Sequence, residues 1–237
     1  MADYTLRRET VLASEAPLEA RRDFIKKTYA HLAAAIFVFM GVEYLLVTSP
    51  LGMKITQLTL GNGRYGWLAV LAAFMVVGWI ADRWSRSTSS SGVQYLGLAV
   101  YVVAEAVIFC PILFLCTYLT QFDGLIGTAG LITAIAFAGL TAVVFLTKAD
   151  FAWMRTLLWA ASFVALGVAV ASLVFGFQIG IVYSAAMVLL ASGYILYYTS
   201  NILHRYPIGF HVAAALALFS AVALLFWYVL RILMSRR

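Results

Sequence analysis

One acidic residue of this chain lies deep inside a long apolar segment, and it is the first candidate for chemistry. Glu105 lies about a dozen residues from either end of the apolar run 93 to 118, too far for its side chain to reach a membrane surface. A carboxyl group at that depth must be protonated, paired or facing water, because desolvation disfavours its charged form. We therefore predict that Glu105 belongs to an ion or proton pathway. The alternative is a neutral acid that is hydrogen-bonded to a neighbouring helix.

Glu43 is a second candidate for the same pathway. It lies nearer the end of its apolar run, so its side chain is also explained by a carboxyl that reaches the membrane surface. Three histidines, His31, His204 and His211, are expected near one face of the membrane. Histidines at such a place either sense pH near neutrality or are ordinary interfacial residues.

Seven apolar runs must position these residues. Hydrophobic residues make up 64% of the 237 positions and charged residues 11%, a ratio that a soluble domain does not hide in one core. The runs extend over residues 28 to 48, 65 to 82, 93 to 118, 125 to 146, 153 to 175, 179 to 203 and 209 to 234. Because about 20 residues cross a bilayer as a helix, we predict an all-α polytopic membrane protein with a seven-transmembrane-helix bundle. Only the linker after the first run is long enough to hold extra structure.

The basic residues predict how the chain is oriented. With a cytoplasmic N-terminus, eleven Lys and Arg residues face the cytoplasm and the outward loops hold only Lys54 and Arg64. With seven spans, the terminal Arg231, Arg236 and Arg237 also fall outside, against this rule. The net charge of +6 is scattered over the ends of apolar runs, so it indicates topology and not a nucleic-acid site. We expect residues 1 to 22 to form a mobile cytoplasmic tail, followed by a transmembrane domain over residues 23 to 237.

Small residues and one proline predict how the helices pack. Small residues recur at every fourth position in three runs, which favours close packing of helices inside the bundle. They are Gly130, Ala134, Ala138 and Ala142; Ala161, Ala165 and Ala169; and Ala213, Ala217 and Ala221. Pro111 removes a backbone hydrogen bond about six residues beyond Glu105, and a kink there could widen a cavity.

The common signatures of membrane enzymes are missing from the sequence. No predicted span contains a Lys, no two Asp residues face each other within spans, and there is no HExxH motif or glycine-rich phosphate loop. We therefore expect a protein without catalytic residues, cofactor or bound metal.

Three segments together resemble the Bax inhibitor-1 family, also called the transmembrane Bax inhibitor motif family. They are residues 22 to 35 (RDFIKKTYAHLAAA), 132 to 151 (ITAIAFAGLTAVVFLTKADF) and 192 to 204 (SGYILYYTSNILH). The resemblance covers about residues 22 to 235. It implies a seven-helix bundle in which the last helix is central and the other six surround it.

The resemblance also implies a place for two acids that this chain lacks. In the family, an aspartate pair on the sixth and seventh helices is associated with a pH-sensitive calcium leak. The matching positions hold Tyr198 and Ala221, or less closely Ser220 in place of Ala221. None of these side chains supplies a carboxylate, the ligand type that calcium sites usually include.

The run Thr199 to Ile202 resembles a bacterial branch of the family that binds the membrane-anchored ATP-dependent protease FtsH. The resemblance implies a modulator of membrane proteolysis or of membrane or ion homeostasis in a bacterial inner membrane. The alternative is a pH-sensitive calcium or cation leak in which Glu105, with Glu43, replaces the aspartate pair. The expected partners are the lipid bilayer, an FtsH-type protease, and Ca²⁺ or H⁺, with no nucleic acid.

Overall fold

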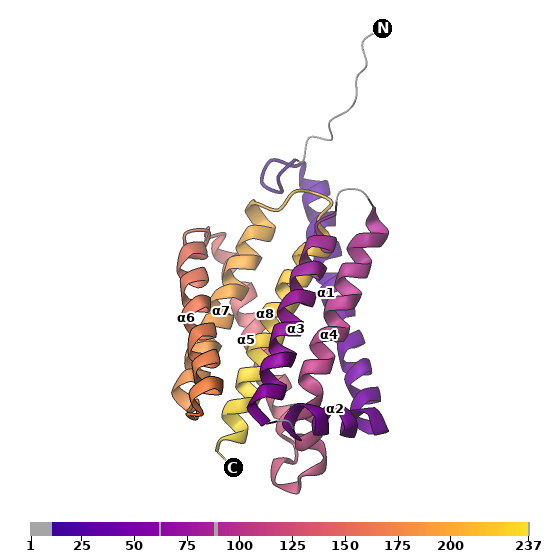
Figure 1. Ribbon diagram of the computed structural model, residues 1–237. Helices are drawn as coiled ribbons and strands as arrows, with labels where there is room; N and C mark the ends of the chain where they lie inside the picture. Colours follow the sequence, from indigo (N-terminus) through magenta and orange to yellow (C-terminus); the bar gives the residue numbers. More distant parts are fainter. Residues whose placement is uncertain (1–10, 62, 88–89, 237) are drawn as a thin grey trace.

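Helices make up nearly all of the described chain. The computed structural model describes residues 11–61, 63–87 and 90–236. The elements in chain order are α1 (Leu18–Thr48), α2 (Pro50–Gly61), α3 (Gly63–Ser85), α4 (Ser91–Tyr118), the 3₁₀ turn η1 (Thr120–Phe122), α5 (Leu125–Thr147), α6 (Met154–Phe175), α7 (Ile181–His204) and α8 (His211–Met234). The long helices run side by side, and α2 and η1 lie at the end of the bundle that carries the C-terminus (Figure 1).

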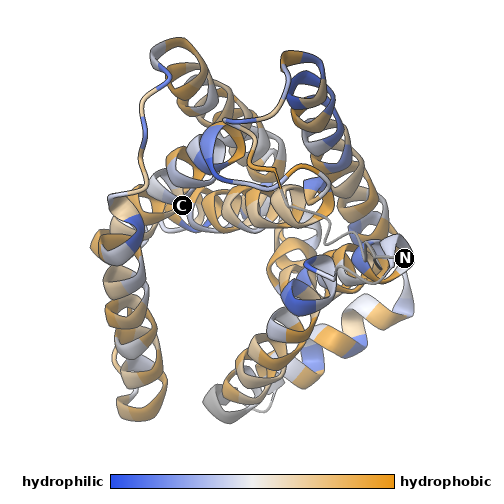
Figure 2. Cartoon of the chain, turned by 90° about the horizontal axis from the view of Figure 1, so that it is seen from above, coloured by the Kyte–Doolittle hydropathy of each residue, from blue (hydrophilic) through white to orange (hydrophobic). Residues whose placement is uncertain are grey.

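Seven of these helices are long and apolar enough to cross a membrane. Seen along the bundle, hydrophilic colours are concentrated in the loops and helix ends, and most of the helical surface is hydrophobic (Figure 2). Large apolar side chains on this surface, such as Leu146 and Val182, are about four-fifths exposed, at 82% and 80%. The predicted seven-span, all-α bundle is confirmed, and the short helix α2 occupies the linker that had room for extra structure.

The start of α1 differs from the prediction. The apolar run predicted a helix from residue 28, but α1 begins at Leu18, directly after Pro17. A helix can extend past the membrane into water. A search for apolar runs finds only the part of the helix that lies in lipid. The first five residues of α1, 18 to 22, therefore lie within the segment predicted to be a tail.

The segment before α1 is attached to the bundle. Leu12 pairs with Pro207, and the amide of Ala13 donates a hydrogen bond to the carbonyl oxygen of Tyr206 over 2.9 Å. Ala13 is completely buried. The prediction of a mobile tail over residues 1 to 22 thus differs from the structure over residues 11 to 22, and residues 1 to 10 lie outside the described residues.

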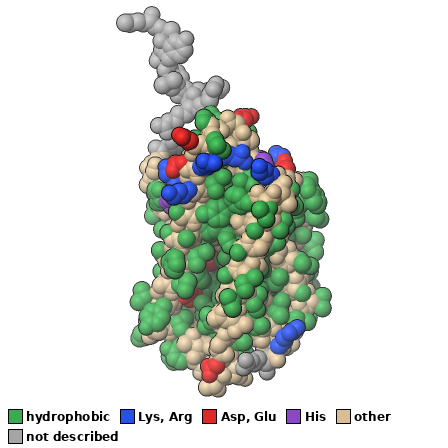
Figure 3. Space-filling view, turned by 180° about the vertical axis from the view of Figure 1, so that it is seen from behind, with side chains coloured by type: hydrophobic (Ala, Val, Ile, Leu, Met, Phe, Trp, Pro, Cys, Tyr) green, Lys and Arg blue, Asp and Glu red, His purple; other side chains and the backbone are tan. Residues whose placement is uncertain are grey.

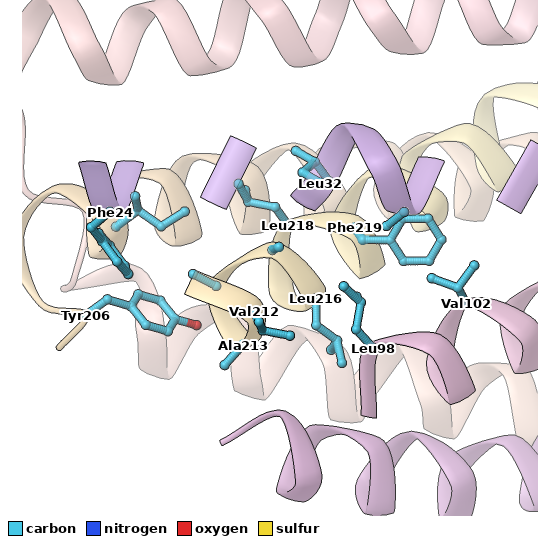
Figure 4. Packing of buried hydrophobic residues seen from close by; sticks show 14 of the residues in the cluster. Phe24, Leu32, Leu98, Val102, Tyr206, Val212, Ala213, Leu216, Leu218 and Phe219 are labelled. Atoms are coloured by element: carbon cyan, nitrogen blue, oxygen red, sulfur yellow. The ribbon is translucent and has the colours of Figure 1, made fainter. Parts of the chain in front are cut away.

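Helix α8 forms the centre of the bundle, as the family resemblance implied. Its buried side chains pack against Phe24 and Leu32 of α1 and against Leu98 and Val102 of α4 (Figure 4). The N-terminal half of α8 is rich in alanine, and Ala213, Ala214 and Ala215 are fully buried. Small side chains let neighbouring backbones approach closely, which is how helices associate where lipid provides no hydrophobic drive.

The three stripes of small residues differ in how deeply they are buried. In α8 the predicted stripe is buried, and in α6 it is half-buried. In α5 the prediction of packing inside the bundle is wrong, because Ala134, Ala138 and Ala142 lie on its exposed face. The four-residue spacing shows that small residues share a face of the helix, but it does not show which way that face points.

Candidate functional site

Glu105 lies in the interior of the bundle, on α4. Its side chain is 7% exposed, and the oxygen Oε2 is buried without a hydrogen-bond partner among the described residues. Tyr101 lies one turn earlier on the same helix and interacts with the Glu105 carboxyl and with Ser220 of α8. The tyrosine is a residue that the sequence analysis missed, although its four-residue spacing from Glu105 predicts that the two share a face.

Glu43 also lies in the interior of the bundle and not at the membrane surface. It is 5% exposed, both of its carboxyl oxygens are buried without a described hydrogen-bond partner, and its carboxyl interacts electrostatically with that of Glu105. The explanation by a surface-reaching side chain is therefore wrong for Glu43. Both acids proposed for one pathway are buried, and Glu43 lies within electrostatic range of Glu105.

Helix α2 accounts for the burial of Glu43. The Sγ atom of Cys110, which also interacts with Glu43, is 4.0 Å from the carbonyl oxygen of Gly52 in α2. A β-carbon at Gly52 would collide with the carbonyl oxygen of Leu46, so only glycine lets α2 fold back this closely against α1. Glu43 lies nearer the end of its span, and it is buried because the linker helix α2 turns back toward α1.

No basic side chain compensates the two acids. Within the described ranges, the ion pairs are Lys27–Asp23, Arg86–Asp82 and Arg205–Asp150, and all of their acids lie near the end of the bundle that carries the N-terminus. Two ionised carboxylates buried within electrostatic range would repel each other, and each would lose its hydration. Protonation of the acids, or a cation bound near them, lowers both costs.

A cavity reaches Glu105 from the C-terminal end of the bundle. Its volume is about 630 Å³, and its wall includes Glu105, residues of α3, α4, α6 and α8, and the connection between α6 and α7. At that connection α6 ends on Gly176, whose φ of 78° is in the left-handed region. Arg231, in the last turn of α8, lines the same cavity. Glu105 therefore faces a partly open space, one of the three conditions that a buried acid can satisfy.

Aromatic rings from three helices pack around the level of Glu105. The ring of Phe39 lies edge-on to the rings of Phe109 and Phe219, with centroids 5.3 and 5.8 Å apart, and Tyr101 contacts Phe219 in the same way at 6.2 Å. These rings connect α1, α4 and α8. Phe109 lies one turn beyond Glu105 and lines the cavity, whereas Tyr101 and Phe219 lie on the side of the N-terminal end, where tight alanine packing continues.

The two positions that hold aspartates in the family carry no charge here. Tyr198 stacks on Tyr194, with ring centroids 5.4 Å apart, and Ala221 is buried in the same apolar cluster that Tyr198 packs against. Tyr198 also interacts with Tyr101, which in turn interacts with Glu105. The two buried carboxyl groups among the described residues thus lie on α1 and α4, and Tyr101 connects one of them to the place of the missing acids.

Two of the three histidines lie together. The rings of His31 and His211 are 4.9 Å apart, and His31 Nε2 is 3.2 Å from the hydroxyl of Tyr95. His204 is instead hydrogen-bonded to the carbonyl oxygen of Ser200 in its own helix, at 3.0 Å. In the described part of the chain, no group of three or more His, Cys, Asp or Glu side chains is placed to hold a metal ion.

Seven apolar spans around a central helix, with two acids in the interior, define an integral multi-pass membrane protein. Residues 21–237 match the family model described as inhibitor of apoptosis-promoting Bax1, so the chain belongs to the Bax inhibitor-1 family. It is also similar to an uncharacterized protein of Pseudomonas aeruginosa, with 35% identity over 125 residues. That match spans about half of each protein, 52% of this chain and 55% of its relative.

Proposed function

We propose that this protein is a non-enzymatic, pH-sensitive leak for protons or cations, with the Glu43–Glu105 pair as its ion-binding site. One observation carries the proposal: an acid without a basic partner in mid-bundle lines a cavity that extends to the C-terminal end. Intramembrane acids that face such a space usually belong to ion or proton pathways. Each proton taken up by the pair removes one of its two negative charges and weakens its hold on a cation, so pH controls occupancy.

The aromatic side of the site supplies the barrier in this proposal. Ions reach Glu105 from the cavity, and passage to the other end requires Tyr101 and Phe219, whose rings are in contact, to move apart. A side-chain rearrangement is needed for each crossing, so the protein is a slow leak and not a wide pore. Calcium is a candidate cation because carboxylate oxygens are its preferred ligands, although two carboxyl groups provide only part of a calcium shell.

The distribution of charge supports a cytoplasmic N-terminus. Lys and Arg side chains gather at the end of the molecule that carries the N-terminus, and the flanks are hydrophobic (Figure 3). Because positive residues in short loops are retained in the cytoplasm, the cavity would open on the opposite side of the membrane. The similarity to a Pseudomonas aeruginosa protein supports our proposal of a bacterial inner membrane.

The test is ion flux into liposomes that contain the purified protein. We expect Glu105→Gln to lower calcium or proton flux to nearly that of protein-free liposomes, and to remove the dependence of flux on pH. Glu43→Gln should lower flux less, because Glu43 does not line the cavity. Glu19→Gln, which changes an exposed acid in the first turn of α1, is the matched control. Flux that is absent from folded wild-type protein, or unchanged by Glu105→Gln at every pH, contradicts the proposal.

A second candidate function is modulation of a membrane-anchored protease of the FtsH type, and the exposed face of α5 favours it. Ala134, Ala138 and Ala142 lie on the outside of the bundle, and a β-carbon at Gly127 or Gly139 would meet nothing within 4 Å. Such a face allows a transmembrane helix of a partner to approach closely. Ala138→Phe should abolish copurification of the protease from membranes, whereas Val143→Phe, at an already bulky exposed position, should not. Equal recovery with both variants contradicts this second function.

A further inference from the structure

Two cavities meet at one arginine near the C-terminal end of the bundle. The second cavity has a volume of about 670 Å³, close to that of the first. The two share five lining residues, Trp67, Gln178, Ile179, Trp227 and Arg231. They are therefore two arms of one space, joined where α3, α8 and the α6–α7 connection come together.

The two arms run along different helices. The first arm extends past Leu71 and Phe74 of α3 and ends at Glu105. The second extends past Leu60 of α2 and along Ile112 and Leu115 of α4. Pro111 lines this second arm, so the proline singled out in the sequence lies beside a cavity, although α4 continues through it as far as Tyr118. Apart from Glu105, most of the wall of each arm is apolar.

The shared junction contains the positive charge of Arg231, which has no ion-pair partner among the described residues. Arg231 is half-buried, and within the described part of the chain its guanidinium makes no hydrogen bond or ion pair. It lies in the last turn of α8, at the level where a span meets the lipid headgroups. The amide side chain of Gln178 lines the same junction. A guanidinium with five free donors suits a phosphate group, which it can bind through two parallel hydrogen bonds.

We propose that an anionic phospholipid of the surrounding bilayer binds here, with its phosphate on Arg231 and one acyl chain in each arm. Three observations select this ligand: two separate apolar arms, one cationic junction, and a place at the membrane surface. A single-chain fatty acid would fill only one arm. A soluble anion would fill neither.

The bound lipid would also affect the acid pair. Its chain in the first arm ends beside Glu105 and occupies the route by which ions are proposed to arrive. Anionic lipid is thus expected to lower flux, and this consequence depends on the proposed leak function. The lipid site itself does not, because it is defined by Arg231 and by the two cavities.

Tryptophan fluorescence provides a direct test, because Trp67 and Trp227 line both arms and their rings stack 6.0 Å apart. The full-length protein is reconstituted in phosphatidylcholine vesicles that contain equal fractions of either brominated phosphatidylglycerol or brominated phosphatidylcholine. Bromine atoms on acyl chains quench nearby tryptophan. We expect more quenching by the brominated anionic lipid, and loss of this excess in Arg231→Gln.

Arg236→Gln is the matched control, because Arg236 is an exposed arginine at the same end that lines neither arm. It should keep the excess quenching, and Trp67→Phe with Trp227→Phe should remove most of it. Equal quenching of the wild-type protein by both lipids overturns the proposal, as does an excess that persists in Arg231→Gln. If Arg231→Gln does not fold, Arg231→Lys replaces it and should reduce the excess, because a lysine cannot form the paired contacts. None of these outcomes requires a flux measurement. A failure of the proposed lipid site can therefore be distinguished from a failure of the proposed leak.

Discussion

The two halves of α8 pack in different ways. Its N-terminal half, from Val212 to Phe219, is almost completely buried, and alanines bring α1 and α4 close to it. Its C-terminal half presents Trp227, Tyr228 and Arg231 and borders both cavities. The large side chains of this C-terminal half hold the neighbouring helices apart, and no other side chains fill the space that remains between the helices. Helix α8 therefore seals the bundle at its N-terminal end and borders cavities at its C-terminal end. The acid pair lies where these two kinds of packing meet.

The largest expected effect comes from filling the open half. Ala169 of α6 lines the cavity that leads to Glu105, so Ala169→Phe should block the route and lower ion flux to nearly that of empty liposomes. The protein should still fold, because the new ring enters existing space. Ala160→Phe, on an exposed face of the same helix, should leave flux unchanged. Wild-type flux through Ala169→Phe would show that ions do not use this cavity.

The next effect comes from enlarging a residue in the sealed half. Ala214→Leu adds volume where the structure has none, and we expect the free energy of unfolding to fall by about 1–3 kcal/mol. Ala142→Leu adds the same atoms to the exposed face of α5 and should change it by less than about 0.5 kcal/mol. Helix content during denaturant unfolding in detergent measures both variants. Equal stability of the two would mean that the halves of α8 do not differ in packing.

A smaller effect is expected from the lipid composition of the membrane. Raising the fraction of phosphatidylglycerol in the liposomes should lower wild-type flux several-fold, because an acyl chain then occupies the arm that ends at Glu105. In Arg231→Gln the flux should no longer respond to this lipid. Flux that rises with anionic lipid in the wild-type protein would contradict a chain in the access route.

The smallest effect concerns the sealed end, where Asp150 and Arg205 join the α5–α6 loop to the end of α7 over 2.8 Å. The Arg205 guanidinium holds the pKa of the Asp150 carboxyl below its ordinary value of 3.8. The pair therefore stabilises the fold fully above that ordinary value, and the contribution is lost as pH falls through the lowered pKa.

Asp150→Asn should thus lower the unfolding temperature slightly near neutral pH, and the difference from wild type should vanish in strong acid. The effect is small because both side chains are exposed to water, which screens their interaction. Asp123→Asn, at an exposed acid of the other end, should show no such pH-dependent difference. A difference that grows in acid would contradict the assigned sign.

Much of the fold could be predicted from the sequence, and less of the site. The seven spans follow from apolar runs, because a bilayer imposes a minimum length on every helix that crosses it. Glu105 could be singled out because its distance from both ends of a run is a property of the sequence. The place of Glu43 could not, because its burial depends on α2 folding back over it at Gly52. The outward stripe of α5 was predicted to be inside, since helix spacing does not fix which way a face points.

By itself, the sequence determined that this chain is a bundle of membrane helices, and the three segments that resemble the Bax inhibitor-1 family indicated the family to which it belongs. Both are encoded locally, in the length of apolar runs and in short motifs. The tertiary structure alone decided that two buried acids lie within electrostatic range of each other, that α8 is sealed at one end and open at the other, and that two cavities join at Arg231. These features depend on which helix faces which, and only packing between segments far apart in the chain fixes that.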